Sequence, residues 1–230
     1  MAIRRGTIYR IPRLVIASGL LVLTNDEWNE APTEELSGAL VFAEAGAGRT
    51  AIPGLAFHAG QLLRVPKGDL TDPLVELSPD ELARVEDGVF EILGLDDLLS
   101  ERPRAPVAQP GEIDYPRWSN IYRAGDRIGT PPERKRYLVV SHDRYNRALG
   151  GAICVRTTSS VRRGGPTIPT LGDGVTKAVC ALPTFWSSHR VGIREARPVP
   201  AQLFMPDMRI VAAALLEALA LPRPGSRRTL

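Results

Sequence analysis

The sequence predicts a mainly β protein with helices, built from two tandem copies of one small, barrel-like domain. A segment repeat is the first observation: LVLTNDEWN at 21–29 recurs as LVVSHDRYN at 138–146, and IYR at 8–10 recurs at 121–123. Short apolar runs between turn residues and one helix pattern near the end of each half are the second and third observations. Internal repetition indicates a duplicated structural unit. The 230 residues suffice for two domains of roughly 100 residues each.

The two copies are expected to span residues 1–99 and 113–222. Between them, residues 100–112 contain three prolines, which favour an extended linker. The basic segment 223–230 is expected to be a mobile tail.

Turn residues delimit each predicted strand. In the first copy the strands are expected at 8–11, 20–23, 39–42 and 61–65. A helix follows, with Ser78 as its N-cap, Pro79 at its first position and Glu81 completing a capping box. The second copy ends in a more apolar helix, from Pro206 through Leu219, which we expect to be buried between the domains. Each domain is therefore expected to be a bent, barrel-like sheet closed by one C-terminal helix.

The charge is divided unevenly between the halves. Residues 1–100 hold 8 Lys and Arg against 16 Asp and Glu, whereas residues 101–230 hold 21 against 10. A basic half favours binding of a polyanion such as nucleic acid, and an acidic half of the same fold indicates that the copies have different roles. Mutual attraction of the two halves is an alternative that is compatible with this interpretation.

No metal, cofactor or membrane segment is predicted. Cys154 and Cys180 lack the spacing of zinc ligands or of a disulfide framework, and are expected to be small core residues. No apolar run reaches the roughly 18 residues of a membrane span, and the N-terminus lacks the apolar stretch of a signal peptide. We expect a cytoplasmic protein.

Basic and hydroxyl side chains gather in the second copy, in a pattern suited to a phosphodiester. Guanidinium groups bind two phosphate oxygens at once and stabilise the charge of a five-coordinate phosphorus, and neighbouring hydroxyls donate to the same oxygens. In RNA the adjacent sugar hydroxyl is the nucleophile, so no metal is required. Solvated surface charge, and core packing for the aromatic residue, are the simpler alternatives. The expected RNA contacts are Arg127, Arg134, Lys135, Arg156, Thr157, Arg162, Arg163 and, for base stacking, Trp186.

The segment KRYLVVSHDRYN at 135–146, followed by ICVRTTSS at 153–160, resembles the MazF/PemK toxin family. The resemblance implies SH3-like barrels related to CcdB, pairing of two such domains, metal-independent cleavage of single-stranded RNA, and neutralisation by an antitoxin. It also implies that Arg136 stabilises the scissile phosphate and that Thr158, with Ser159 beside it, lies in the active site. The chain departs from the family where Tyr137 follows this arginine, since the family usually has proline there.

The first copy is expected to be degenerate. Its spacing from the second copy is 113 residues at IYR, 117 at the Asp and Asn of the second motif, and again 113 at residues 39–41. This alignment places Gly19 at the position of Arg136, and Glu44 and Ala45 at those of Thr157 and Thr158. We therefore expect one active site and a monomeric pseudo-dimer, in which the first copy replaces the second subunit.

These observations predict an endoribonuclease toxin of a toxin-antitoxin system. It would cut single-stranded RNA to a 2′,3′-cyclic phosphate with Arg136, Thr158 and Ser159, and a cognate antitoxin would be its partner. The alternative is a tandem barrel without catalytic activity that binds RNA, an antitoxin or a gyrase-type partner.

Overall fold

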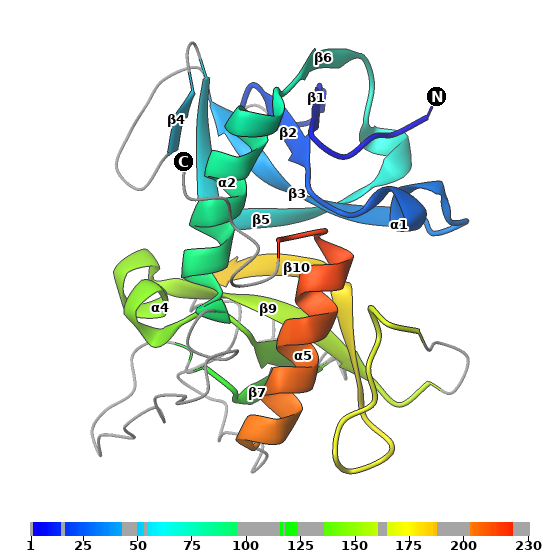
Figure 1. Ribbon diagram of the computed structural model, residues 1–230, viewed down its shortest axis with the longest axis vertical. Helices are drawn as coiled ribbons and strands as arrows, with labels where there is room; N and C mark the ends of the chain where they lie inside the picture. The colour runs from blue at the N-terminus through cyan, green and yellow to red at the C-terminus, as the bar shows by residue number, and fades with distance from the viewer. Residues whose placement is uncertain are drawn as a thin grey trace, which may run out of the picture.

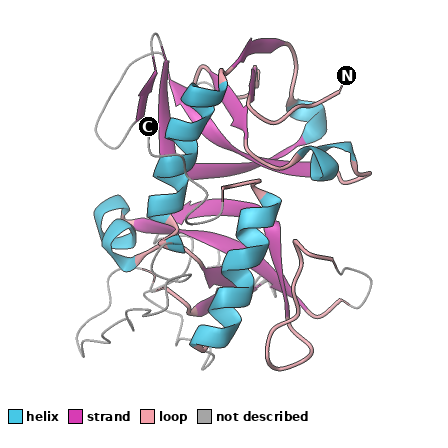
Figure 2. Ribbon diagram, in the orientation of Figure 1, coloured by secondary structure: helices cyan, strands magenta, loops and turns pink. Residues whose placement is uncertain are grey.

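The structure, a computed structural model, describes residues 2–14, 17–42, 50–52, 55–95, 116, 118–123, 136–160, 165–187 and 203–222. The linker expected at 100–112 and the tail expected at 223–230 lie outside these ranges. The protein is mainly β with a few helices, and its strands form two antiparallel sheets, one in each half of the chain (Figures 1 and 2).

The first half contains a six-stranded sheet with the order β4-β5-β3-β2-β1-β6. Its predicted strands are present, although β3 and β5 are longer than expected because both continue past a register shift beside Ala39 and Leu40. The strand bounds are β1 Thr7–Tyr9, β2 Gly19–Val22, β3 Glu35–Phe42, β4 Thr50–Ile52, β5 Leu55–Pro66 and β6 Pro73–Glu76.

The second half contains a four-stranded sheet with the order β10-β9-β8-β7. It repeats the spatial order β5-β3-β2-β1 of the first sheet, and its register also shifts once, between Val179 and Thr184 of β10. The strand bounds are β7 Ile121–Arg123, β8 Arg136–Val139, β9 Gly151–Thr158 and β10 Lys177–Ser187.

Within the part of the chain that the structure describes, the strands form two antiparallel sheets and no closed barrel. One sheet ends at β4 and β6 and the other at β10 and β7, so neither closes on itself by hydrogen bonds. The bulges bend β5 and β10 strongly, as barrel formation would require. Each sheet is instead covered by a long helix and by the other half of the chain.

The capping box predicted at Ser78 is present. Its hydroxyl accepts from the backbone of Glu81 and the Glu81 carboxylate accepts from the Ser78 backbone, so helix α2 (Pro79–Ile92) begins where the sequence indicates. The apolar C-terminal helix α5 (Met205–Ala218) is also present. The short helices α1 (Asp26–Glu30) and α4 (Asp143–Leu149), and the 3₁₀ turn Lys67–Asp69, were not predicted.

The same buried hydrogen bonds occur in both halves after the second strand. In the first half the Thr24 hydroxyl donates to the Asn29 side-chain carbonyl at 2.6 Å, and the Asn29 amide donates to the Thr24 carbonyl at 2.9 Å. Ser141 and Asn146 form the same two bonds in the second half. The repeated segment therefore encodes one local structure: a strand, a buried hydroxyl–amide pair and a short helix.

The long helices α2 and α5 join the two halves. They run in opposite directions, and each ends against the other half (Figure 1). The backbone N–H of Asn25 donates to the Ala218 carbonyl at 2.9 Å, and that of His142, the corresponding residue in the second half, donates to the Ile92 carbonyl at 2.9 Å. A single apolar core contains residues of both sheets and both helices, among them Leu21, Val89, Val155 and Leu215.

Among the described residues, no helix combines the length and the apolar character needed to cross a membrane.

Candidate nucleic-acid interface

The candidate site lies where the strands of the second sheet end together. In the antiparallel ladder Arg136 is opposite Thr157, and on its other side Arg123 of β7 is opposite Arg136. Thr158 is opposite Lys177 of β10. Two neighbouring rungs at one sheet end therefore combine cationic and hydroxyl residues from four strands.

The predicted catalytic residues reach the same sheet end but do not share a face. Successive side chains of a strand point to opposite faces, and directly paired residues share one. Leu138 and Val155 lie in the core shared with the helices, whereas Tyr137 lies in a separate cluster on the other face. By this alternation Arg136 and Thr157 lie on the face of Leu138 and Val155. Arg156 and Thr158 lie on the face of Tyr137. Arg136 and Thr157 are therefore neighbours on one face of the sheet, and Arg156 and Thr158 are neighbours on the other face.

The two threonine hydroxyls differ in their availability. The Thr157 hydroxyl donates to the Arg136 carbonyl at 3.2 Å, and this residue is only 6% exposed. The Thr158 hydroxyl oxygen instead accepts from the backbone of Ser160 at 3.2 Å, and its proton has no acceptor among the described residues. Ser159 and Ser160 are exposed beyond the end of β9. Among the described residues at this strand end, the hydroxyls of Thr158, Ser159 and Ser160 are consequently available to donate to a ligand.

Arg156 has a buried donor that no described residue satisfies. Its Nε is inaccessible to solvent and has no hydrogen-bond partner within the described ranges. On the same face, the rings of Tyr137 and Trp186 pack with their centroids 4.8 Å apart, over a cluster that includes Ala152 and Cys154. A buried guanidinium donor without a partner is costly, so this position favours an acceptor supplied from outside the described residues.

Cys154 and Cys180 are buried, as the sequence predicts. Burial raises the pKa of both thiols, because the thiolate is poorly solvated in the core. They are therefore unsuited to nucleophilic chemistry.

The corresponding end of the first sheet keeps Arg10, the counterpart of Arg123, but the other described residues aligned with the site differ from the expectation. The ladder pairs Gly19 with Val41 where the second half pairs Arg136 with Thr157. The counterparts of Thr157 and Thr158 are therefore Val41 and Phe42, and the assignment of Glu44 and Ala45 is wrong. The sequence comparison matched residues 39–41 with residues 152–154, three residues away from the register that the ladders define, and a shift of three places every side chain of the strand on the wrong face.

Gly19 also cannot be replaced by a larger residue without a local shift. A Cβ at this position would lie 2.7 Å from the carbonyl oxygen of Tyr9. The backbone of the first half therefore excludes a side chain where the second half presents Arg136, so the two sheet ends differ in shape as well as in side chains.

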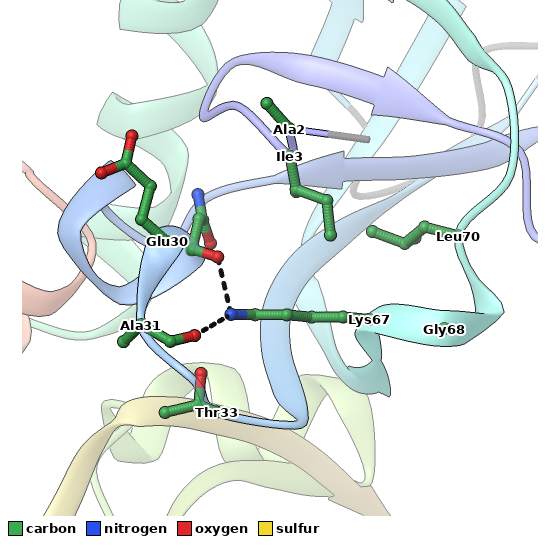
Figure 3. A pocket seen from close by; sticks show the side chains of 9 residues that line it. Ala2, Ile3, Glu30, Ala31, Thr33, Lys67, Gly68 and Leu70 are labelled. Carbon is green, nitrogen blue, oxygen red and sulfur yellow. Dashed lines mark hydrogen bonds between the residues drawn. The ribbon is translucent and has the colours of Figure 1, made fainter.

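A cavity of about 480 Å³ lies in the first half, away from the cationic sheet end. Figure 3 shows Lys67 crossing it toward the end of α1. The ammonium group donates to the carbonyls of Trp28, Asn29 and Ala31 at 3.1, 2.6 and 2.8 Å, and burial lowers its pKa. All three of its protons stabilise the helix C-terminus, so this lysine is explained by the fold.

The remaining predicted contacts, Arg127, Arg134, Lys135, Arg162 and Arg163, lie outside the described residues. Within the described ranges, no three His, Cys, Asp or Glu side chains gather as a metal ion would require.

Comparisons with known proteins give structural neighbours only. No model of a protein family matches the chain, and no curated protein matches it. One similar solved structure is an endoribonuclease in complex with its cognate antitoxin from Mycobacterial species; it is 24% identical over 47% of this chain and 99% of that chain, with a TM-score of 0.38. Another is an endoribonuclease from Mycobacterial species, 23% identical over 49% of this chain and 98% of that chain, with a TM-score of 0.40.

Proposed function

We propose that the protein is a metal-independent endoribonuclease toxin that cleaves single-stranded RNA at the end of the second sheet. The observation that carries the proposal is the gathering of guanidinium and hydroxyl groups on two neighbouring rungs, at the positions that the MazF/PemK resemblance assigns to an active site. The first sheet has Gly19, Val41 and Phe42 there instead. One site per chain, cytoplasmic action and a cognate antitoxin as partner belong to the same proposal.

The reaction requires only groups that the RNA and these side chains supply. The ribose 2′ oxygen loses its proton and forms a bond to the adjacent phosphorus, while the bond from phosphorus to the 5′ oxygen breaks and that oxygen gains a proton. The product is a 2′,3′-cyclic phosphate. A guanidinium beside the non-bridging oxygens stabilises the charge of the five-coordinate transition state, and a hydroxyl donates to the same oxygens.

In this proposal Thr158 and Ser159 have the role that the sequence predicts, which is supported by the availability of both hydroxyls at the strand end. Two guanidinium groups are candidates for the stabilising role. Arg136 is the residue that the resemblance indicates, whereas Arg156 shares a face with Thr158. The geometry favours Arg156 for the scissile phosphate and leaves Arg136 at the edge of the same site.

The first half serves as the structural partner of the catalytic half. The matching contacts of Asn25 with Ala218 and of His142 with Ile92 support this role, since each half holds the end of the other half's long helix. We propose that the chain is a duplicated toxin domain folded as a monomeric pseudo-dimer.

Single-turnover cleavage of an end-labelled single-stranded RNA tests the proposal. Replacing the stabilising arginine by alanine is expected to lower the cleavage rate by about 10²–10³, the cost of removing one preorganised donor. We expect this loss for Arg156→Ala. Arg144→Ala is the matched control, because this exposed arginine lies on α4 beyond the opposite end of β8.

Cleavage is also expected to persist in excess EDTA. Its product is expected to carry a terminal 2′,3′-cyclic phosphate, which phosphatase cannot remove. If only Arg136→Ala lowers the cleavage rate, Arg136 is the residue that stabilises the scissile phosphate, as the sequence predicts. If the purified protein binds RNA but never cleaves it, the alternative of a binding module is correct.

A further inference from the structure

The first half places a tryptophan against the sheet that carries the candidate site. Trp28 belongs to α1, and its ring packs on Ile168, Val179 and Leu182 of the second half. The indole N–H donates to the Glu35 carbonyl of β3 at 3.0 Å. The first half therefore fixes the orientation of a ring that lies on the second half.

The side chains beneath this ring belong to a row that crosses the second half on one face. The backbone N–H groups on either side of Val179 donate to the carbonyls on either side of Ile168, at 3.0 Å each, which places these two residues opposite each other. Val179 is in turn opposite Arg156, and Arg156 is opposite Tyr137. Directly paired residues share a face, so Trp28 packs on the same row that contains Arg156.

Packing confines Arg156 within this row. Its Nε is inaccessible to solvent and has no hydrogen-bond partner among the described residues, so no bond from this atom to a described group directs the guanidinium. One of its two neighbours in the row, Val179, is covered by Trp28. Because side chains in a close-packed interior transmit strain to one another, removal of the ring is expected to loosen Val179 and, through it, Arg156.

A second contact from the first half holds the same stretch of β10. The buried Ser37 hydroxyl donates to the Pro183 carbonyl at 3.0 Å. Pro183 lies within the register shift that separates Val179 from Thr184. The bend of β10 beside the row is thus held from the first half at two points.

We propose that Trp28 is a positioning residue for the candidate site: acting through Val179, it holds Arg156 at the end of the second sheet, on the face of Thr158. The inference rests on the proposed function for the role of Arg156 in cleavage. It gives the first half a part in the reaction beyond its contacts with the long helices.

Nuclear magnetic resonance of the Arg156 side chain tests the positioning without catalysis. The signal of its Nε–H group is assigned by its absence in Arg156→Lys, and its hydrogen exchange is measured relative to that of the Val89 backbone amide in the shared core. We expect Trp28→Ala to raise this ratio by about 10-fold or more, because the row then opens locally without global unfolding. Val179→Ala shortens the other side of the contact and is expected to raise the ratio as well, which decides the question if Trp28→Ala fails to fold.

Tyr145→Ala is the matched control. Tyr145 occupies the position of Trp28 in the second copy of the repeat, but it contacts Glu91 and the core shared with the helices. Its removal is expected to leave the exchange ratio of Arg156 unchanged.

Steady-state cleavage of RNA provides the second measurement. A displaced group slows the reaction without removing a charge that binds the substrate, so Trp28→Ala is expected to lower kcat by about 10–10² with little change in KM. Trp28→Phe retains an aromatic ring and is expected to restore most of the lost rate.

An exchange ratio that rises no more in Trp28→Ala and Val179→Ala than in Tyr145→Ala would overturn the inference, even if RNA is cleaved as proposed. A changed KM with an unchanged kcat in Trp28→Ala would also overturn it, since Trp28 would then act on binding. If RNA is not cleaved but the ratio rises as expected, the proposed activity fails and the positioning of Arg156 by Trp28 stands.

Discussion

Arg5 links the first half to the end of helix α5, and its replacement provides a sharp test of how the halves depend on each other. Its Nε and Nη2 donate to the Leu219 carbonyl at 3.0 and 2.7 Å, and Nη2 also donates to Glu86 at 2.7 Å. The Arg5 and Glu86 side chains are each 12% exposed. Arg5→Ala therefore leaves a buried helix-end carbonyl and a mostly buried carboxylate without this partner.

The expected loss follows from those contacts. Hydrogen bonds to charged groups contribute about 1.5–3 kcal/mol each, and leaving a buried group unpaired adds to that cost. Because some solvent reaches the pair, we expect a total loss of about 3 kcal/mol in the free energy of unfolding. In a chain of this size such a loss lowers Tm by about 6–12 °C.

Urea unfolding followed by circular dichroism measures the change, with the slope against denaturant checked for two-state behaviour. Arg13→Ala is the matched control, since its side chain is 83% exposed and lies 3.7 Å from Asp69; we expect a change below about 0.5 kcal/mol. Glu86→Gln separates the two roles of Arg5, because it removes the ion pair and keeps the contact with Leu219. If Arg5→Ala unfolds at the same urea concentration as Arg13→Ala, the proposed dependence of the second half on the first is refuted.

Two further predictions concern stability. The Tyr145 hydroxyl donates to Glu91 at 2.5 Å, and burial together with this carboxylate raises the pKa of Tyr145 to about 12. Because the folded protein favours the neutral phenol, the Tyr145 contact contributes its full stability below the unfolded pKa of about 10, and this stability is lost as the pH rises toward 12. Urea midpoints measured over this pH range should show the loss of stability. The loss should be absent in Tyr145→Phe. Gly19→Ala is expected to destabilise the protein by about 1–3 kcal/mol, because a Cβ would meet the Tyr9 carbonyl. Gly68→Ala is the control, since a Cβ there meets no atom within 4 Å. Equal urea midpoints for the two variants would contradict the conclusion that the backbone at Gly19 excludes a side chain.

Local chemistry made part of the fold predictable. The capping box at Ser78 and Glu81 defines the start of α2 because its two hydrogen bonds depend only on residues three apart. Helices α1 and α4 escaped prediction because five and seven residues are too few for an apolar period. The structure stabilises them by other means: their N-cap residues, Asn25 and His142, also donate to the long helix of the opposite half.

The sequence allowed the residues of the candidate site to be placed at one strand end, but not their arrangement on the two faces of the sheet. Hydroxyl and basic residues at 156–159 indicate a phosphate site from sequence alone, and they do lie at one strand end. Their division between two faces depends on which residue of β8 pairs with Thr157, and no local pattern encodes that register. The unsatisfied donor of Arg156 is likewise a consequence of tertiary burial.

The two halves have matching scaffold contacts while their sheet ends differ, and the physical roles of those contacts explain this combination. The last carbonyls of α5, at Glu217, Ala218 and Leu219, accept hydrogen bonds from Asn25 and Arg5 of the first half. Helix α5 packs against β10 and contributes to the shared core, so the sheet that carries the candidate site depends on donors from the first half. Arg136, Thr157 and Thr158 make none of these contacts with the long helices, whereas Asn25 and Arg5 make several. Under the proposed function, a single site in the second half therefore requires the donors of the first half but no second site there.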